Sequence, residues 1–306
     1  MIQRPTVFVL GAGASKPYNF PLGSELTAEI RQIPENRQII KELHTDDEIE
    51  QFQEALRLSR QPSIDAFLEH RPEFTKVGKI CIANALIRRE KTHALMKQSD
   101  WYDSLLAKLG PTFAHINQNQ ITIVTFNYDR SLEQYLFTAI RNRYLRSDDE
   151  EAMAKTAEAI NRLKIIHFYG QIGYLPWQTH GPDDPVREYE STVDRMSLQL
   201  AASGIKLVTE DRKENVDRIK AAKAALDNAE TIFFLGFGYL QENMKRLGFP
   251  RSVDRQRQRG TAFDLKSAER QNFEELYPPL GLGKDDQDCL SYLRDNLDYL
   301  RLEREE

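Results

Sequence analysis

The chain has 306 residues, of which 40% are hydrophobic and 29% are charged, and its formal net charge at pH 7 is -5. This composition is typical of a globular protein with one large or two modest domains, and it excludes a largely disordered chain. The negative charge gives no general attraction to nucleic acid or anionic membranes, so we expect no direct nucleic-acid binding.

The two cysteines cannot build a disulfide framework or a four-cysteine zinc site. They indicate a reduced, cytoplasmic setting. No stretch of the sequence is typical of a signal peptide or a membrane span, and we expect neither.

The first predicted element is a strand at residues 6–10, which leads directly into Gly-Ala-Gly-Ala-Ser at residues 11–15. Gly11 and Gly13 allow close backbone approach, and the exposed N–H groups of such a turn can hold a diphosphate. Lys16 stands where a dehydrogenase fingerprint has its third glycine, and no P-loop Gly-Lys-Ser/Thr follows. The pattern therefore predicts a phosphate-binding loop of another kind, with a plain strand-to-helix turn as the alternative.

Residues 24–120 contain no convincing strand. Apolar residues recur there at helical spacing, which predicts helices at residues 25–33, 46–58, 63–68, 76–89 and 101–109. So long a helical stretch after one strand is not a tight βαβ unit. We therefore expect a helical module of residues 24–120 inserted into an α/β core of residues 1–23 and 121–306.

Further strands are predicted in the second part of the chain, at residues 121–126, 164–168, 205–209 and 231–235. Predicted helices at residues 132–140 and 216–226 separate them. Short, nearly continuous apolar runs are expected of parallel strands covered on both faces. The sequence thus predicts a Rossmann-like α/β fold: a parallel sheet with helices on both faces and a helical insertion after the first strand.

The polar stretches between these elements give weaker signals. Residues 181–200 and 248–272 are predicted to be loops or short helices. The arginine-rich run at residues 251–259 is expected to be a solvated segment rather than a binding patch. Residues 285–302 are predicted to form a closing amphipathic helix.

Asn127 and Asp129 follow the predicted strand at residues 121–126. They therefore lie at the carboxyl end of a parallel strand, where α/β proteins bind ligands. Asp129 is also placed to cap the next helix, and Asn127 taken alone could be a turn residue.

Two more motifs follow later strands. His167 and Tyr169 are two residues apart, just before Gly170. Because side chains of a strand alternate between its two faces, this spacing predicts that both lie on the same face. The alternative is that His167 is a core residue, as a lone histidine in a strand usually is. A second Gly-x-Gly, at residues 236–238, ends the last predicted strand, with Asn243 shortly after it. It predicts another close backbone approach, with a bulge or a helix cap as the alternative.

In this order, the motifs resemble the sirtuin-like (silent information regulator) superfamily, and most of all its zinc-free bacterial branch, whose members cleave NAD in antiphage defence. The resemblance covers nearly the whole chain and includes Ser-Ile-Asp-Ala-Phe-Leu at residues 63–68. It implies that NAD is bound by Gly11, Ala12, Gly13, Ser15, Pro21, Thr125, Gly236, Phe237, Gly238 and Asn243.

The resemblance also implies a chemistry in which the nicotinamide–ribose bond of NAD breaks through a cationic, oxocarbenium-like state. Asn127 would position the ribose or the attacking water, and Asp129 would hold the loop and the nicotinamide amide. The family's histidine would act as the base, for which its ordinary pKa is suited.

This chain departs from the family pattern at two points. It lacks the cysteines of the deacylase zinc ribbon, which shifts the expectation from protein deacylation to NAD hydrolysis. Tyr169 stands where the family has its histidine. Either His167, two residues earlier, acts as the base in its place, or Tyr169 acts as a hydrogen-bond partner only, because a phenol of pKa about 10 is a weak base. A chain that only binds NAD or a product is the third possibility.

We therefore expect an NAD glycohydrolase, an NAD+ nucleosidase that releases nicotinamide and ADP-ribose and depletes cellular NAD in antiphage defence. The alternatives are a catalytically weak NAD- or ADP-ribose-binding subunit and, less favoured, an NAD-dependent deacylase. Zinc and membrane are not expected. The resemblance implies a homo-oligomer, a sensor partner, or both; the partner would be nucleotide-pyrophosphatase-like, Argonaute-type or a ring ATPase.

Overall fold

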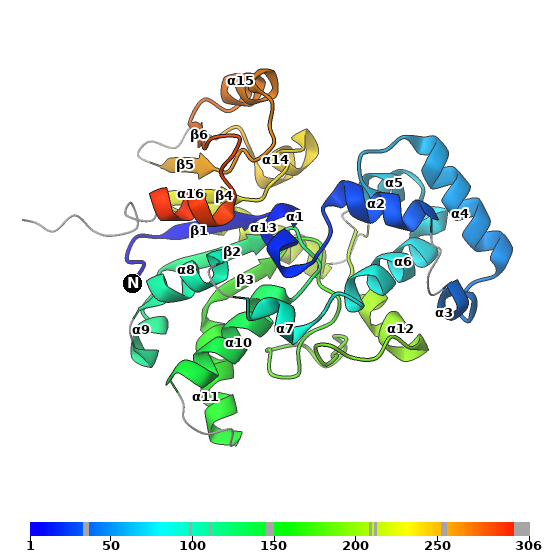
Figure 1. Ribbon diagram of the computed structural model, residues 1–306, viewed down its shortest axis with the longest axis horizontal. Coiled ribbons are helices and arrows are strands. Elements are labelled where there is room, and N and C mark those ends of the chain that lie inside the picture. Colours follow the sequence, from blue (N-terminus) through cyan, green and yellow to red (C-terminus); the bar gives the residue numbers. More distant parts are fainter. Residues whose placement is uncertain are drawn as a thin grey trace, which may run out of the picture.

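The computed structural model describes residues 1–32, 37–97, 100–110, 112–144, 150–207, 210, 213–251 and 256–296. These residues contain a six-stranded parallel sheet in the order β3-β2-β1-β4-β5-β6 (Figure 1). The strands are β1 (Thr6–Leu10), β2 (Ile121–Thr125), β3 (Lys164–His167), β4 (Thr231–Leu235), β5 (Arg257–Gly260) and β6 (Leu280–Leu282). This arrangement confirms the predicted Rossmann-like α/β fold, and the strand order reverses between β1 and β4.

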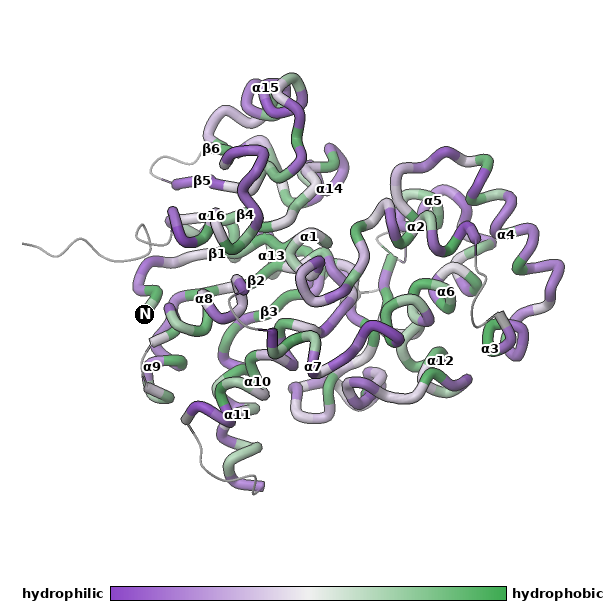
Figure 2. The backbone as a smooth tube through the Cα atoms, viewed as in Figure 1, coloured by the Kyte–Doolittle hydropathy of each residue, from purple (hydrophilic) through white to green (hydrophobic). Residues whose placement is uncertain are grey.

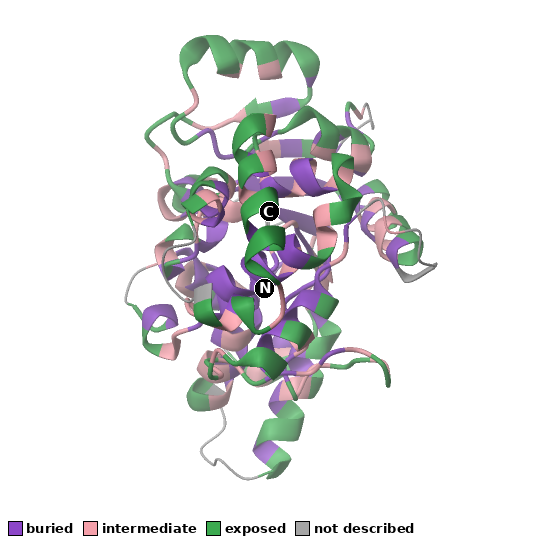
Figure 3. Cartoon of the chain, turned by 90° about the vertical axis from the view of Figure 1, so that its right-hand side faces the viewer, coloured by how far each residue is buried: buried purple, intermediate pink, exposed green. Residues whose placement is uncertain are grey.

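The centre of the sheet is its most apolar part. Every residue of β1 and β4 is buried, and Phe8 stacks on Phe233 across the two strands with ring centroids 5.4 Å apart. Figure 2 shows hydrophobic residues along these strands and many polar residues on the outer helices, and Figure 3 shows buried residues in the interior and exposed residues at the periphery. Strands buried on both faces need no polar alternation, which explains why their sequences are continuous apolar runs.

Helices flank the sheet on both sides. In Figure 1, α8, α10 and α16 lie in front of it and α13 lies behind. The helices are α1 (Ala12–Ser15), α2 (Gly23–Gln32), α3 (Arg37–Lys41), α4 (Asp46–Ser59), α5 (Ile64–His70), α6 (Thr75–Ile87), α7 (Thr92–Leu95), α8 (Trp101–Leu109), α9 (Phe113–Ile116), α10 (Ser131–Tyr144), α11 (Glu150–Arg162), α12 (Arg195–Gly204), α13 (Lys213–Asp227), α14 (Gln241–Leu247), α15 (Ser267–Leu276) and α16 (Cys289–Asn296), with 3-10 turns at Lys16–Tyr18 and Pro72–Phe74.

The helices predicted between β1 and β2 are present, but they do not all lie together. Helices α2 to α6 lie to one side of the sheet (Figure 1), whereas α8 packs beside it. The indole Nε1 of Trp101 in α8 donates to the carbonyl oxygen of Ala14 at 2.7 Å, and Tyr102 stacks on Tyr18 at 3.7 Å. The last part of the predicted module (residues 24–120) is thus in close contact with the turn after β1. The division of the chain into a core and an inserted module stays a prediction.

The strand predicted at residues 205–209 is wrong in its described part, residues 205–207. Ile205 forms only an isolated antiparallel bridge with Gly170. The N–H of Lys206 donates to the carbonyl oxygen of Tyr169 at 2.8 Å, so this segment pairs with the loop after β3 and does not extend the sheet. Residues 208–209 lie outside the described residues.

The prediction of loops or short helices at residues 248–272 is wrong where the chain forms strand β5. Strand β6 was not predicted. The sequence of β5 is Arg-Gln-Arg-Gly, and Figure 2 shows it as a hydrophilic strand. Backbone pairing with β4 and β6 holds β5 in place, and this pairing leaves no apolar pattern in the sequence. Residues 252–255 of the arginine-rich run and the end of the predicted closing helix, from residue 297, lie outside the described residues.

Candidate functional site

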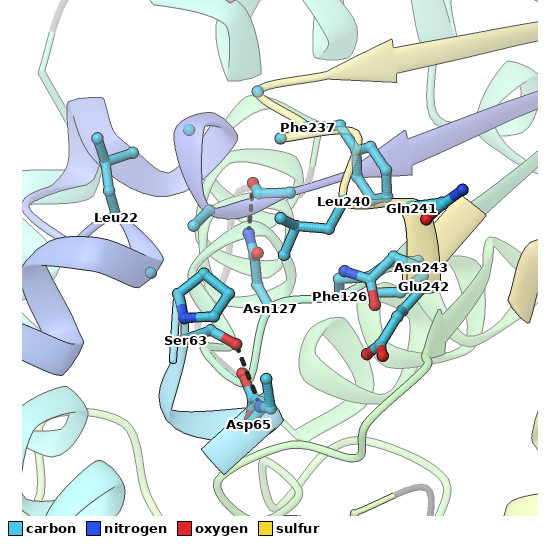
Figure 4. Close-up of a pocket in the computed structure, with 18 of the residues that line it drawn as sticks. Leu22, Ser63, Asp65, Phe126, Asn127, Phe237, Leu240, Gln241, Glu242 and Asn243 are labelled. Atoms are coloured by element: carbon cyan, nitrogen blue, oxygen red, sulfur yellow. Dashed lines mark hydrogen bonds between the residues drawn. The ribbon is translucent and has the colours of Figure 1, made fainter. Parts of the chain in front are cut away.

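The carboxyl ends of the strands open onto a cavity of about 580 Å³ (Figure 4). Loops after β1 to β5 line it, together with α5 and α14. It lies at the carboxyl ends of β1 and β4, between which the strand order reverses, and open α/β sheets bind ligands at such a point. Its volume is that of a small-molecule site.

The structure brings most of the predicted site residues to this cavity. Its lining includes Gly11, Ala12, Gly13, Asn127, Tyr169, Gly236, Phe237, Gly238 and Asn243. The other predicted residues lie behind or beside the lining: Ser15, Pro21, Thr125, Asp129 and His167.

The two glycine motifs contact each other. The N–H of Gly11 donates to the carbonyl oxygen of Leu235 at 3.0 Å, and the N–H of Gly13 donates to the carbonyl oxygen of Gly236 at 2.9 Å. A Cβ atom on Gly13 would lie 2.8 Å from the Cα of Gly236, and one on Gly236 would lie 2.0 Å from the nitrogen of Ala14. These glycines therefore allow two backbone loops to touch, and the N–H groups of Gly11 and Gly13 already have acceptors within the protein.

Asn127 is held in one orientation by the first glycine loop. Its Nδ2 donates to the carbonyl oxygen of Gly11 and to Oγ of Ser15, both at 2.9 Å, and its backbone N–H donates to Oγ1 of Thr125 at 3.1 Å. Because the carbonyl of Gly11 can only accept, the amide cannot be turned over. Among the residues that the structure describes, no donor reaches Oδ1 of Asn127, so this atom can accept a hydrogen bond from a ligand in the cavity.

His167 lies beneath this loop and does not line the cavity. Its Nδ1 is 2.9 Å from the carbonyl oxygen of Asn127, and its Nε2 is 2.5 Å from Oε1 of Glu133. Burial acts to lower the pKa of His167, but the charge and hydrogen bond of Glu133 outweigh it, and the net shift is upward. Both ring nitrogens face acceptors, so the imidazole supports Asn127 from behind and has no basic atom directed at a ligand.

Tyr169 lines the cavity, and its hydroxyl is engaged on both sides. It donates to Oδ1 of Asn243 at 2.7 Å and accepts from Nη1 of Arg246 at 2.6 Å. Burial raises the pKa of Tyr169 and exceeds the opposing effect of Arg246, so the phenol stays neutral. The Nη2 of Arg246 donates to Oε2 of Glu69 in α5 at 2.6 Å, and this chain of contacts joins the loop after β3 to α14 and α5.

Asp129 has the capping role that its position predicts. Its Oδ1 accepts from the backbone N–H of Ser131 at 3.1 Å and from the Ser131 hydroxyl, at the start of α10. The carboxyl group is buried, and burial raises its pKa. It fixes the loop between β2 and α10 from inside and does not line the cavity.

Sequence reasoning predicted Asn243 of α14, but it missed Arg246 on the same helix and the acidic residues that α5 brings to the site. Asp65 lines the cavity, and its Oδ1 accepts a hydrogen bond from the hydroxyl of Tyr128. Arg246, three residues after Asn243, is on the next turn of the same helix. The spacing of Asp65 and Glu69 by four residues was a signal that they share a helix face, but nothing in the sequence placed that face beside the carboxyl ends of the strands.

Two further properties concern metals and membranes. Within the described ranges there is no group of three or more His, Cys, Asp or Glu side chains that could hold a metal ion, and Cys81 and Cys289 are buried and unpaired. Across the same residues, no helix has both the length and the apolar character needed to cross a bilayer.

No protein-family model matches the chain, and no curated protein matches it either.

Proposed function

We propose that the chain is an NAD glycohydrolase, which binds NAD as a substrate in the cavity at the carboxyl ends of β1 and β4. The observation that carries the proposal is the amide of Asn127, which is fixed by Gly11 and Ser15 and leaves Oδ1 as an acceptor at the cavity. A fixed acceptor of this kind can orient a ribose hydroxyl or a water molecule for attack.

The cavity lining also supports a nucleotide ligand. Leu22, Leu240 and Phe263 are exposed large apolar side chains, and all three line the cavity. They offer apolar surface to a flat ring, and the polar groups of Asn127 and Asn243 offer hydrogen bonds to a sugar.

The proposed reaction is a hydrolysis with a simple balance. The bond between C1′ of the ribose and the nicotinamide nitrogen breaks, and its electron pair neutralises the nicotinamide ring. The oxygen of water bonds to C1′, one proton is released to solvent, and ADP-ribose is the second product. Asn127 orients the ribose or the water, Tyr169 with Asn243 and Arg246 shapes the wall, and His167 keeps the Asn127 loop in place.

A second function, binding of NAD or ADP-ribose without turnover, is favoured by one specific observation. Neither candidate base offers a free basic atom to the cavity, because the ring nitrogens of His167 and the hydroxyl of Tyr169 are already hydrogen-bonded. In that case the chain would be a subunit that senses or retains the nucleotide.

The setting that we propose follows from the resemblance of the motifs. NAD depletion in the cytoplasm would serve antiphage defence, and a partner protein or self-assembly would activate it. A homo-oligomer and a sensor of the nucleotide-pyrophosphatase, Argonaute or ring-ATPase type are the candidate assemblies.

The test is incubation of the purified protein with NAD, with nicotinamide and ADP-ribose separated by chromatography. Asn127→Ala should abolish cleavage, whereas Asn142→Ala, an exposed residue of α10, should leave it unchanged. Full activity of Asn127→Ala would overturn the proposal. Binding of NAD without any cleavage, measured by calorimetry, would favour the binding function.

A further inference from the structure

Asp65 is a cavity carboxylate in a firmly held position. Ile64, Phe67 and Leu68 of α5 are buried, and the Ser63 hydroxyl accepts from the N–H of Ala66 at 3.2 Å, which caps the helix. Figure 4 shows Asp65 near Ser63, at the edge of the cavity below Asn127. The helix thus fixes one acidic side chain at the cavity.

The partner of this carboxylate is neutral. Its Oδ1 accepts from the hydroxyl of Tyr128, and within the described part of the chain no Lys or Arg forms an ion pair with it. The nearby cation, Arg246, is instead committed to Glu69 and Tyr169. Burial raises the pKa of Asp65, and the negative charge of Glu69 raises it further. The hydrogen bond from Tyr128 and a smaller attraction to Arg246 act to lower it, but the net shift is upward.

Asp65 is half-buried at the cavity wall, and a carboxylate in such a place without a paired cation is unfavourable unless a positive charge reaches it. NAD carries such a charge on its nicotinamide ring, and the charge passes to the ribose as the glycosidic bond breaks. ADP-ribose and NADH lack a charged ring. A negative group fixed beside the cationic half of NAD would favour the transition state most, because it needs no reorganisation when the charge moves.

We propose that Asp65 is a further catalytic residue, whose carboxylate faces the nicotinamide–ribose half of bound NAD and stabilises the positive charge that develops on the ribose. This inference rests on the proposed function. The C1′–N bond breaks with its electron pair moving to nicotinamide, water bonds to C1′ and its proton goes to solvent, and Asp65 itself is unchanged.

The assignment gives the helical segment before β2 a direct part in the chemistry. Tyr128 lies between Asn127 and Asp129 in the loop after β2, and its hydrogen bond to Asp65 connects that loop to α5. Tyr128 is therefore a positioning residue. Its replacement by Phe removes a hydrogen bond that favours the charged form of Asp65, and it leaves the carboxyl group less well placed.

The experiment compares the wild type with Asp65→Asn, which removes the negative charge and keeps one oxygen that can accept from Tyr128. Calorimetry with NAD, NADH and ADP-ribose measures binding, and chromatography measures turnover. The wild type should bind NAD about tenfold more tightly than NADH, and Asp65→Asn should lose this preference while it binds ADP-ribose as before. Where turnover is measured, kcat should fall roughly a hundredfold.

Controls separate the possible failures. Glu73→Gln, an exposed acidic residue after α5, should behave as the wild type, and ADP-ribose binding by Asp65→Asn shows that the variant is folded. An unchanged preference for NAD over NADH in Asp65→Asn overturns the Asp65 assignment alone. Failure of the wild type to bind any of the three nucleotides overturns the proposed function, and the assignment with it.

Discussion

Glu133 places a carboxylate oxygen 2.5 Å from Nε2 of His167, in a buried pair directly beneath the loop that carries Asn127. The other ring nitrogen of His167 meets the carbonyl oxygen of Asn127 at 2.9 Å. Since a carbonyl cannot donate, Nδ1 carries a proton, and a second proton is shared between Nε2 and the carboxylate. The pair is therefore a support for the site whose stability depends on pH.

Replacement of His167 by Gln should expose this pH dependence. The pKa of His167 is raised in the folded protein, so its stabilising contribution is fully present below the unfolded pKa of about 6.5 and is lost as pH rises through the folded value. The wild type should exceed His167→Gln in unfolding free energy by about 3 kcal/mol near pH 6, and by less at higher pH.

Denaturant unfolding at several pH values, followed by circular dichroism, measures this difference. The charged groups that face His167 are Glu133 and Asp129. Glu133→Gln should flatten the same pH dependence, whereas the exposed His180→Gln should not. A difference between the wild type and His167→Gln that is equal at pH 6 and pH 9 would contradict the protonated pair.

Tyr169→Phe tests whether the phenol takes part in proton transfer. Because Tyr169 is a neutral hydrogen-bond partner of Asn243 and Arg246, Tyr169→Phe loses two hydrogen bonds of the cavity wall but no proton-transfer group. The value of kcat for NAD should therefore fall by about tenfold. Removal of a general base typically costs on the order of a hundredfold or more.

The measurement is kcat as a function of pH for the wild type, Tyr169→Phe and Tyr277→Phe, a tyrosine outside the cavity lining. The shape of the profile should be the same in all three. A loss above a hundredfold in Tyr169→Phe, together with the disappearance of one limb of the profile, would show that Tyr169 is the base.

The central sheet could be predicted from the sequence because its strands carry local signals. The apolar runs of β1 and β4 are long enough to identify each strand alone. Their pairing, with Leu10 beside Leu235, joins residues far apart in the chain and has no local signal. For the same reason the glycines at positions 11, 13 and 236 were expected to approach something closely, but not each other.

The site was predicted in outline, and its chemistry differs in detail. Asn127 reached the cavity because it directly follows a strand. The expectation that His167 and Tyr169 share a face was wrong because β3 ends at His167, and Gly170, with φ of 71°, turns the chain beyond it. The two side chains border different cavities. Asp65 was out of reach of sequence reasoning because its place depends on how α5 packs.

A buried ion cluster around Glu90 should make the fold sensitive to the loss of its one shared anion. Glu90 pairs with Arg130 and with Arg187, both at 2.7 Å, and the side chains are at most 3% exposed. The Nη1 of Arg130 also donates to the carbonyl oxygen of Arg187 at 2.6 Å. Removing the shared anion would leave two buried cations without a counter-charge, so Glu90→Gln should cost about 3–5 kcal/mol of unfolding free energy.

Urea unfolding at pH 7 measures that loss. The matched control is Glu158→Gln, whose exposed pair with Arg162 one helical turn away should contribute less than about 0.5 kcal/mol. Equal stability of the two variants would mean that the two buried arginines do not depend on the charge of Glu90.

The contact between the two glycine loops predicts opposite outcomes for two glycines only two residues apart. Gly236 has a φ of 56°, and a Cβ atom there would lie 2.0 Å from the backbone nitrogen of Ala14, so neither loop can make room without moving β1 or β4. Gly236→Ala should therefore cost more than about 3 kcal/mol or prevent folding. Gly238 lines the same cavity, but a Cβ atom there would meet nothing within 4 Å, so Gly238→Ala should fold normally. Thermal unfolding of the wild type and both variants measures these differences. A Gly236→Ala protein as stable as Gly238→Ala would mean that the two loops do not touch as described.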